Sequence, residues 1–155
     1  MRTLALSTAL LAAGSLAAQT PPSPPATSPD SAGSRVVVIG QTLAGVLSRA
    51  DALSQDSTYV QRWLLHGQSG QTVTIELISL EFDAYIMLKG PGITGSRDYS
   101  DDDSGGQCNA RLTVTFPHTG EYEIIVNTRG KLETGTFTLV VGAGSKPKSL
   151  TRCNR

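Results

Sequence analysis

Regular alternation of apolar and polar side chains constrains the fold of this chain more than any other feature of its sequence. In residues 112–116, leucine, valine and phenylalanine alternate with threonine. The same period of two recurs at residues 71–79, 84–89, 121–127 and 136–141. Because successive side chains of a strand point to opposite faces of a sheet, this period indicates strands with one buried and one solvated face. The sequence therefore predicts antiparallel β-sheets.

Further strands are expected from short runs rich in apolar and aromatic residues at 35–39 and 59–65, each followed by a turn that contains glycine. Residues 41–54 fit either a strand or a helix, because their leucines follow a helical spacing while Gly45 and the threonine and valine content oppose one. No alternation of strands with helices supports an α/β fold. The predicted fold class is all-β, an antiparallel, jelly-roll-like β-sandwich of seven or eight strands.

Residues 1–18 have the pattern of a secretory signal peptide. Arg2 supplies a positive charge, Leu4–Leu16 is an apolar run broken only by small residues, and small side chains follow where a signal peptidase requires them. Cleavage is expected after Ala18 or Ala17. The run is too short to span a membrane, and a buried N-terminal helix is the alternative. The mature protein is therefore expected to be secreted, into the periplasm or fully outside the cell.

Residues 19–34 contain five prolines and almost no bulky apolar side chain. Such a segment cannot bury enough surface to offset the entropy of ordering, so we expect a disordered Pro/Ser-rich linker. Residues 35–155 are then predicted to form a single domain, which is within the usual length for one.

The mature chain is almost neutral. The full sequence has thirteen Lys and Arg and thirteen Asp and Glu, so loss of Arg2 with the signal leaves twelve against thirteen. This balance gives no electrostatic reason to bind nucleic acid. No later segment approaches the roughly 18 apolar residues of a membrane helix. We therefore expect no nucleic-acid partner, no membrane span after signal removal, and a monomer.

The two cysteines, Cys108 and Cys153, belong to a chain predicted to enter an oxidising compartment. An even pair of cysteines there is most simply a disulfide, which would contribute about 2–4 kcal/mol to stability. The sequence contains neither a CxxC redox motif nor a zinc-type cluster of Cys and His. The predicted role of the bridge is therefore structural.

Short segments in a fixed order resemble the bacterial pre-peptidase C-terminal domain over roughly residues 36–142. The segments that carry the resemblance are Gly70-Gln71, Val73-Thr74-Ile75, Phe82-Asp83-Ala84-Tyr85, Leu88, Asp101-Asp102-Asp103, Asn109-Ala110-Arg111-Leu112, Phe116-Pro117-His118-Thr119-Gly120-Glu121-Tyr122, Ile125-Val126 and Gly135-Thr136-Phe137-Thr138-Leu139. Their order and spacing together are fairly specific.

The resemblance implies a jelly-roll-like β-sandwich of the kind appended to secreted peptidases and other exported enzymes. Such domains look like non-catalytic modules that aid secretion, localisation or substrate binding, and some bind calcium. An exported peptidase or an extracellular polymer would then be the partner. This chain departs from the usual setting, since no peptidase domain precedes the module. The acidic positions of the family pattern fit Asp83 and Asp101–Asp103.

An acidic loop is the main candidate for a metal site. Its oxygen-bearing side chains lie within twelve residues and are Asp98, Asp101, Asp102, Asp103 and Asn109. Calcium takes six to eight oxygen ligands, which carboxylates and loop carbonyls supply well. The alternative is an ordinary solvated turn whose carboxylates accept hydrogen bonds from nearby N–H groups. Calcium is thus a candidate cofactor for this chain and not an established requirement, and an EF-hand is excluded because its DxDxDG pattern does not occur.

Asp83 could supply a distal ligand to the same cation. The alternative, which the sequence favours, is a carboxylate that accepts N–H hydrogen bonds in the turn before a strand.

Catalysis is not expected. A nucleophile would need His66 or His118 as its base, and neither a GxSxG elbow nor an HExxH motif is present. Carboxylates such as Glu121 and Glu123 lie on the polar side of the alternation, which favours solvated sheet surface over a glycosidase pair. For ligand binding, the aromatic candidates are Tyr85 and Tyr99.

Three functions follow from these features. The leading hypothesis is a secreted, non-catalytic binding or targeting module that aids an exported enzyme or binds an extracellular polymer. The second is a structural or assembly protein of the cell envelope, and the third is a small secreted hydrolase with an unfamiliar site.

Overall fold

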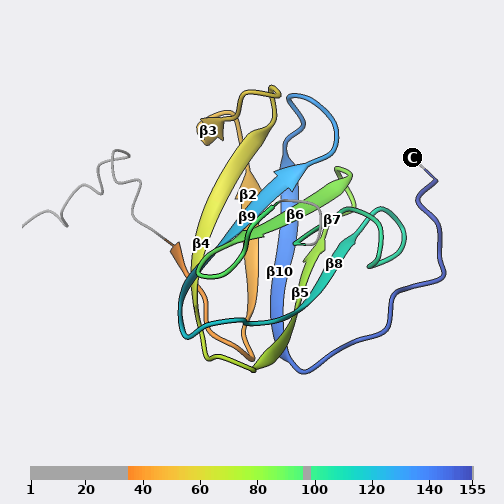
Figure 1. Ribbon diagram of the computed structural model, residues 1–155. Helices are drawn as coiled ribbons and strands as arrows, with labels where there is room; N and C mark the ends of the chain where they lie inside the picture. The colour runs from red at the N-terminus through yellow and green to blue at the C-terminus, as the bar shows by residue number, and fades with distance from the viewer. Residues whose placement is uncertain (1–34, 96–98, 155) are drawn as a thin grey trace, which may run out of the picture. The chain divides into compact units, whose positions relative to one another are not determined.

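The computed structural model describes residues 35–95 and 99–154. The signal peptide and linker predicted for residues 1–34 lie outside this part of the chain. The described residues contain ten β-strands and no helix long and apolar enough to cross a membrane. The strands are β1 (Arg35–Val36), β2 (Thr42–Leu47), β3 (Ala52–Leu53), β4 (Tyr59–Gly67), β5 (Thr72–Ile78), β6 (Ala84–Lys89), β7 (Ser100–Asp101), β8 (Ala110–Thr115), β9 (Gly120–Thr128) and β10 (Gly135–Ala143) (Figure 1).

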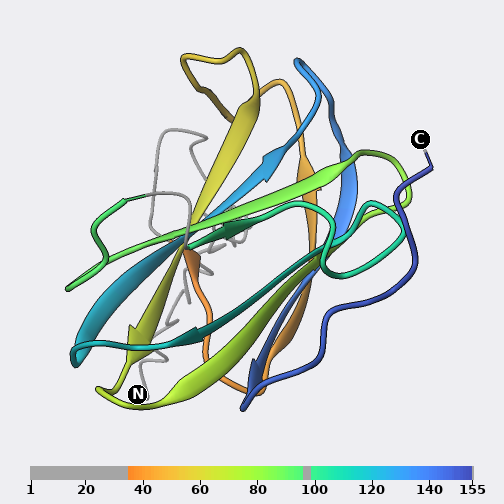
Figure 2. The same ribbon diagram turned by 45° about the vertical axis from the view of Figure 1, so that its right-hand side comes forward.

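These strands form two sheets packed face to face, as Figures 1 and 2 show from two directions. The first sheet has the order β1-β4-β9-β6-β7, with β3 added beside β4. The second has the order β2-β10-β5-β8. All pairs are antiparallel except that of β1 with β4. The predicted antiparallel β-sandwich is therefore confirmed. The described residues form ten strands instead of the seven or eight expected, because β1, β3 and β7 have two residues each and are too short to show an alternating pattern.

The alternation seen in the sequence separates core from surface. In β10, Phe137, Leu139 and Val141 are buried, and the residues between them are partly exposed. Leu139 lies in register between Leu43 on β2 and Leu77 on β5, so one row of apolar side chains crosses the second sheet. Rows of this kind from both sheets form a single hydrophobic core.

Residues 41–54, which fitted either a strand or a helix, form β2 and β3. Gly45 of β2 lies directly opposite Phe137 of β10. A Cβ atom on Gly45 would lie 2.3 Å from Cζ of the Phe137 ring, so only glycine leaves room for the ring there. The glycine that opposed a helix is thus the residue that admits the core phenylalanine.

β9 departs from simple alternation near its end. Asn127 was expected on the solvated face but is only 1% exposed, and its outward-facing neighbour Ile125 is only 2% exposed. On this outer face, residues 52–56 line the same hollow as Asn127 and Ile125. These lining residues come from a distant part of the sequence, so local patterning could not predict the hollow.

Residues 144–153 run along the outer face of the second sheet, and we call them the C-terminal strap (Figure 2). The Lys146 backbone N–H donates to Thr74 Oγ1 at 3.1 Å, and Arg111 donates to the Pro147 carbonyl at 2.5 Å. Further along, the Ser149 N–H donates to the carbonyl of Ser104 at 2.8 Å. The strap therefore covers the β5–β8 side of this sheet.

Glu76 of β5 holds the strap electrostatically. Its carboxylate lies 2.8 Å from the Arg111 guanidinium and also pairs with the Lys146 ammonium group. Burial raises the pKa of Glu76, but the hydrogen bonds and charges of Lys146 and Arg111 outweigh burial, so the pKa lies below its ordinary value. The folded protein therefore favours the ionised carboxylate.

Glu76→Gln is expected to lower stability near pH 7 by roughly 1 kcal/mol, since the Lys146 side chain is 46% exposed and its charge is screened. Because the folded-state pKa is depressed, the stabilisation is present above the unfolded pKa and is lost as pH falls through the folded value. The difference between wild type and variant should therefore shrink below about pH 4. Urea unfolding from pH 7 to pH 3 measures it, with the exposed Glu121→Gln as control. A difference that stays constant over this range would contradict the prediction.

Candidate functional site

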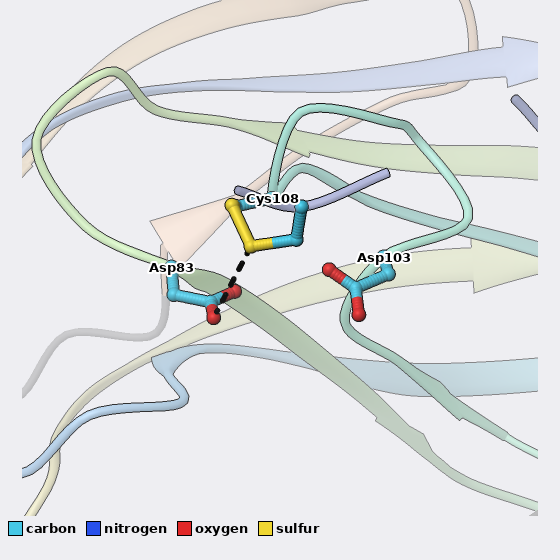
Figure 3. Close-up of side chains that lie close together, drawn as sticks. Asp83, Asp103 and Cys108 are labelled. Carbon is cyan, nitrogen blue, oxygen red and sulfur yellow. Dashed lines mark hydrogen bonds between the residues drawn. A yellow bond between two sulfur atoms is a disulfide. The ribbon is translucent and has the colours of Figure 1, made fainter. Parts of the chain in front are cut away.

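The carboxylates of Asp83 and Asp103 converge beside the disulfide between Cys108 and Cys153 (Figure 3). One carboxylate oxygen of each aspartate and the two sulfur atoms all lie within 4.8 Å of one another. Asp83 is half-buried, directly before β6, and Asp103 is exposed in the loop after β7. We call the two carboxylates the acid pair.

Backbone hydrogen bonds fix the position of Asp83. The Arg129 N–H donates to the Asp83 carbonyl at 2.9 Å, and the Ala84 N–H donates to the Cys108 carbonyl at 3.0 Å. In the preceding turn, Ser79 Oγ accepts from the N–H of Phe82 at 3.2 Å, and the Phe82 ring is buried in the core. The turn that carries Asp83 is therefore anchored on both sides.

The predicted disulfide is present. Cys108 is buried in the loop between β7 and β8, and Cys153 lies at the end of the strap. Cys153 Sγ lies 3.8 Å from Asp83 Oδ2, so the bridge forms one wall of the acid pair. Oxidised sulfur offers no thiolate, which leaves hard oxygen atoms as the ligands that this cluster presents to a metal.

The other predicted metal ligands make hydrogen bonds or ion pairs within the protein. Asp101 Oδ1 accepts from the N–H groups of Ser104 at 2.9 Å and Arg111 at 2.8 Å. Its carboxylate therefore has the turn role that was the alternative to metal binding. Asp102 lies 3.3 Å from the Arg129 guanidinium.

Asn109 also has a protein partner, because its Oδ1 accepts from the Ser79 N–H at 2.9 Å. Asp98 lies outside the described residues. Of the predicted ligands within the described ranges, the structure thus brings Asp83 and Asp103 together.

Both aromatic candidates lie in the first sheet or beside it. The half-buried Tyr85 ring is on the outer face of β6, with the Arg129 guanidinium 5.9 Å from its centroid. Tyr99 packs against the core, and its carbonyl accepts from the Leu88 N–H at 2.8 Å. The two tyrosines are therefore not equivalent, because only Tyr85 belongs to an outer sheet face.

The two histidines occupy separate positions. His66 is exposed on β4, opposite Glu121, and His118 lies in the turn before β9, where its backbone contacts the Tyr122 hydroxyl. Within residues 35–95 and 99–154, neither imidazole makes a hydrogen bond to a serine or cysteine side chain.

A hollow of about 600 Å³ lies on the outer face of the first sheet. Its floor includes Val60, Ile125 and Asn127, and one wall is formed by residues 52–56. We call it the outer hollow. A second hollow of about 530 Å³, on the outer face of the other sheet, is lined largely by apolar side chains, including the exposed Leu80.

Comparison with known proteins identifies the fold. No family model matches the chain, and no curated protein matches it significantly in sequence. Among solved structures, the pre-peptidase C-terminal domain of a collagenase from Bacillus anthracis matches with a TM-score of 0.51 and 15% sequence identity. The match covers 70% of this chain and 93% of that domain. The two share a fold.

Two periplasmic inhibitors of g-type lysozyme also match, with lower TM-scores. The inhibitor from Salmonella Typhimurium gives 0.45 at 20% identity, covering 71% of this chain and 99% of that one. The inhibitor from Aeromonas hydrophila gives 0.43 at 15% identity, covering 70% and 98%.

Three features of this sandwich were not predicted from the sequence. The outer hollow is lined in part by residues 52–56, which are distant in sequence from β9, and the strap depends on contacts of Lys146 and Pro147 with distant strands. Asn127, the buried polar residue of the hollow, occupied a position that alternation assigned to solvent. The one sequence signal for the burial of Asn127 was its position directly after the apolar pair Ile125-Val126.

Proposed function

We propose that this chain is an exported, non-catalytic binding module of the pre-peptidase C-terminal family, and that its acid pair binds calcium. The shared fold and the ordered sequence segments support the family, and the Cys108–Cys153 disulfide supports an extracytoplasmic location. The single observation that carries calcium binding is the convergence of Asp83 and Asp103.

The chemistry of the acid pair favours a hard divalent cation. Two carboxylates at this separation repel each other unless a cation or hydrogen-bond donors offset their charge. Together they offer up to four oxygens, and water and loop carbonyls would supply the remainder of the six to eight that calcium takes. A site with so few charged ligands belongs with the weaker extracellular calcium sites, whose Kd is about 0.1–1 mM.

Calcium is expected to raise the melting temperature through this site. At about 10 mM calcium and a Kd of about 1 mM, selective binding to the folded state adds about 1.4 kcal/mol. For a domain of this size, the melting temperature should rise by roughly 4–6 °C. Asp103→Asn, which removes one charge from an exposed side chain, should abolish the rise. Differential scanning calorimetry with calcium and with EDTA measures both values.

The matched control is Asp102→Asn, because Asp102 is paired with Arg129 instead of Asp83. This variant should keep the calcium-dependent rise, and magnesium at equal ionic strength should reproduce little of it. Equal melting temperatures in calcium and EDTA would refute the calcium site, as would a full rise in Asp103→Asn.

A further inference from the structure

The outer hollow has the construction of a ligand site. A volume of about 600 Å³ is within the range of pockets that hold small ligands. The buried side chains of Val60 and Ile125 form an apolar floor, and Met87 lies beside Ile125 in register on β6. Methionine adapts its shape to different partners, which suits a surface that binds a flexible side chain.

Asn127 presents a hydrogen-bond donor to this hollow. The residue is only 1% exposed and lines the hollow. Its Oδ1 accepts from the Thr128 N–H at 2.6 Å, whereas its amide nitrogen makes no hydrogen bond to the described residues. An acceptor oxygen from a bound ligand would satisfy it.

The charged groups around the hollow favour an anionic ligand at one end. Lys89 is exposed on the hollow's side and makes no ion pair within the described ranges. Arg62 also lines the hollow and is 2.8 Å from Glu123. The one carboxylate in the lining, that of Asp56, is turned into its own loop, where it accepts from Thr58 Oγ1 at 2.7 Å. Lys89 lies opposite Glu123 in register, but that carboxylate is paired with Arg62, so the Lys89 ammonium group is the charge that remains available for a ligand.

The lining argues for a peptide over a carbohydrate. Sugars are typically held against an open aromatic ring, and no aromatic side chain lines the hollow in the described part of the chain. The nearest candidate, Tyr85, lies opposite Asn127 in register, but the Arg129 guanidinium is stacked near its ring. Apolar floor, amide donor and lysine match the side chain, carbonyl and carboxylate of a peptide.

We infer that the outer hollow binds a short acidic peptide segment. The Asn127 amide donates to a peptide carbonyl, an apolar side chain rests on Ile125 and Met87, and an adjacent Asp or Glu pairs with Lys89. This inference rests on the proposed function, a binding module, and names the chemistry of its ligand. It does not depend on calcium binding, because Asp83 of the acid pair lies directly before β6, whereas Met87 and Lys89 of the hollow lie near the end of that strand.

Titration of the oxidised protein with capped peptides, followed by ¹⁵N-NMR, tests the site. The probe is Ac-Gly-Leu-Glu-Gly-NH₂, used with its reversed order Ac-Gly-Glu-Leu-Gly-NH₂. We expect saturable shift changes at residues 52–56, 87–89 and 125–127, with a Kd of about 1 mM for at least one order. Replacing Glu by Gln in the peptide should weaken binding about three- to fivefold, as expected for an exposed ion pair.

Lys89→Gln should weaken binding of the Glu peptide by the same factor and remove its advantage over the Gln peptide. Lys148→Gln, which removes an exposed lysine of the strap, should change neither value. No shift changes up to about 10 mM peptide would overturn the inference. So would shifts at the hollow with chitotriose but not with peptides.

Peptide-dependent shifts confined to another face would also overturn the hollow as the site, although they would leave the binding module standing. If the protein does not respond to calcium but binds the peptide at the hollow, the calcium proposal fails and the peptide proposal stands.

Discussion

Replacing Phe82 with alanine is expected to lower the free energy of unfolding by about 3–5 kcal/mol, because it removes a large ring from the core. The Phe82 ring is 1% exposed and meets the Phe137 ring edge-on, with 6.5 Å between centroids. Its removal leaves a cavity that the close-packed sheets cannot fill. Urea unfolding followed by the fluorescence of Trp63, the single tryptophan, measures the loss.

Phe82→Leu is the matched variant, because it keeps most of the buried volume and should cost less than about 1.5 kcal/mol. If the alanine variant does not fold, the leucine variant still reports on packing at this position. Phe82 precedes Asp83 in the anchored turn. Because leucine keeps most of the packing that holds this turn in place, the leucine variant should also keep the calcium response. A loss below about 1 kcal/mol for alanine would show that the ring is not packed as described.

Removing the disulfide with Cys108→Ala/Cys153→Ala is expected to lower the free energy of unfolding by about 2–4 kcal/mol. The bridge joins residues 45 apart in sequence, so its loss enlarges the unfolded ensemble and frees the end of the strap. The melting temperature should fall by roughly 10 °C. Calorimetry of the double variant beside the oxidised wild type measures the change.

Reduction of the wild-type protein with a dithiol provides the matched comparison, since it breaks the same bond without altering side-chain volume. Reduced wild type and double variant should melt within about 2 °C of each other. A double variant as stable as the oxidised protein would mean that the strap's hydrogen bonds hold the tail without the bridge.

Much of the fold could be predicted because its cause is local. Side chains such as Val73, Ile75 and Leu77 alternate with polar neighbours, and this alone places them in the core. The role of Gly45 could not be predicted locally, because this glycine leaves room for the ring of Phe137, on a strand about ninety residues away in sequence. Local pattern predicts a strand's faces but not its neighbours.

The candidate site shows the same division. The acidic residues were predicted as one group because they are close in sequence, whereas the structure separates Asp101 and Asp102 from the acid pair by giving them backbone and arginine partners. Which carboxylate meets Asp83 depends on how the loop closes over the disulfide. Asn127 was assigned to solvent for a related reason, since residues 52–56, which line the hollow with it, are distant in sequence.

The disulfide also determines how the domain would respond to a mechanical load. A pull on the strap would pass through Cys153 into the loop that precedes β8, and it would largely bypass the hydrogen bonds of β10 in the centre of its sheet. When a strand is pulled from one end, its hydrogen bonds break one after another. The disulfide instead passes part of the force to β8, the edge strand of the same sheet. In the oxidised domain, a pull at Cys153 would therefore be shared between two strands of the second sheet, whereas after reduction it would act on β10 through the strap alone.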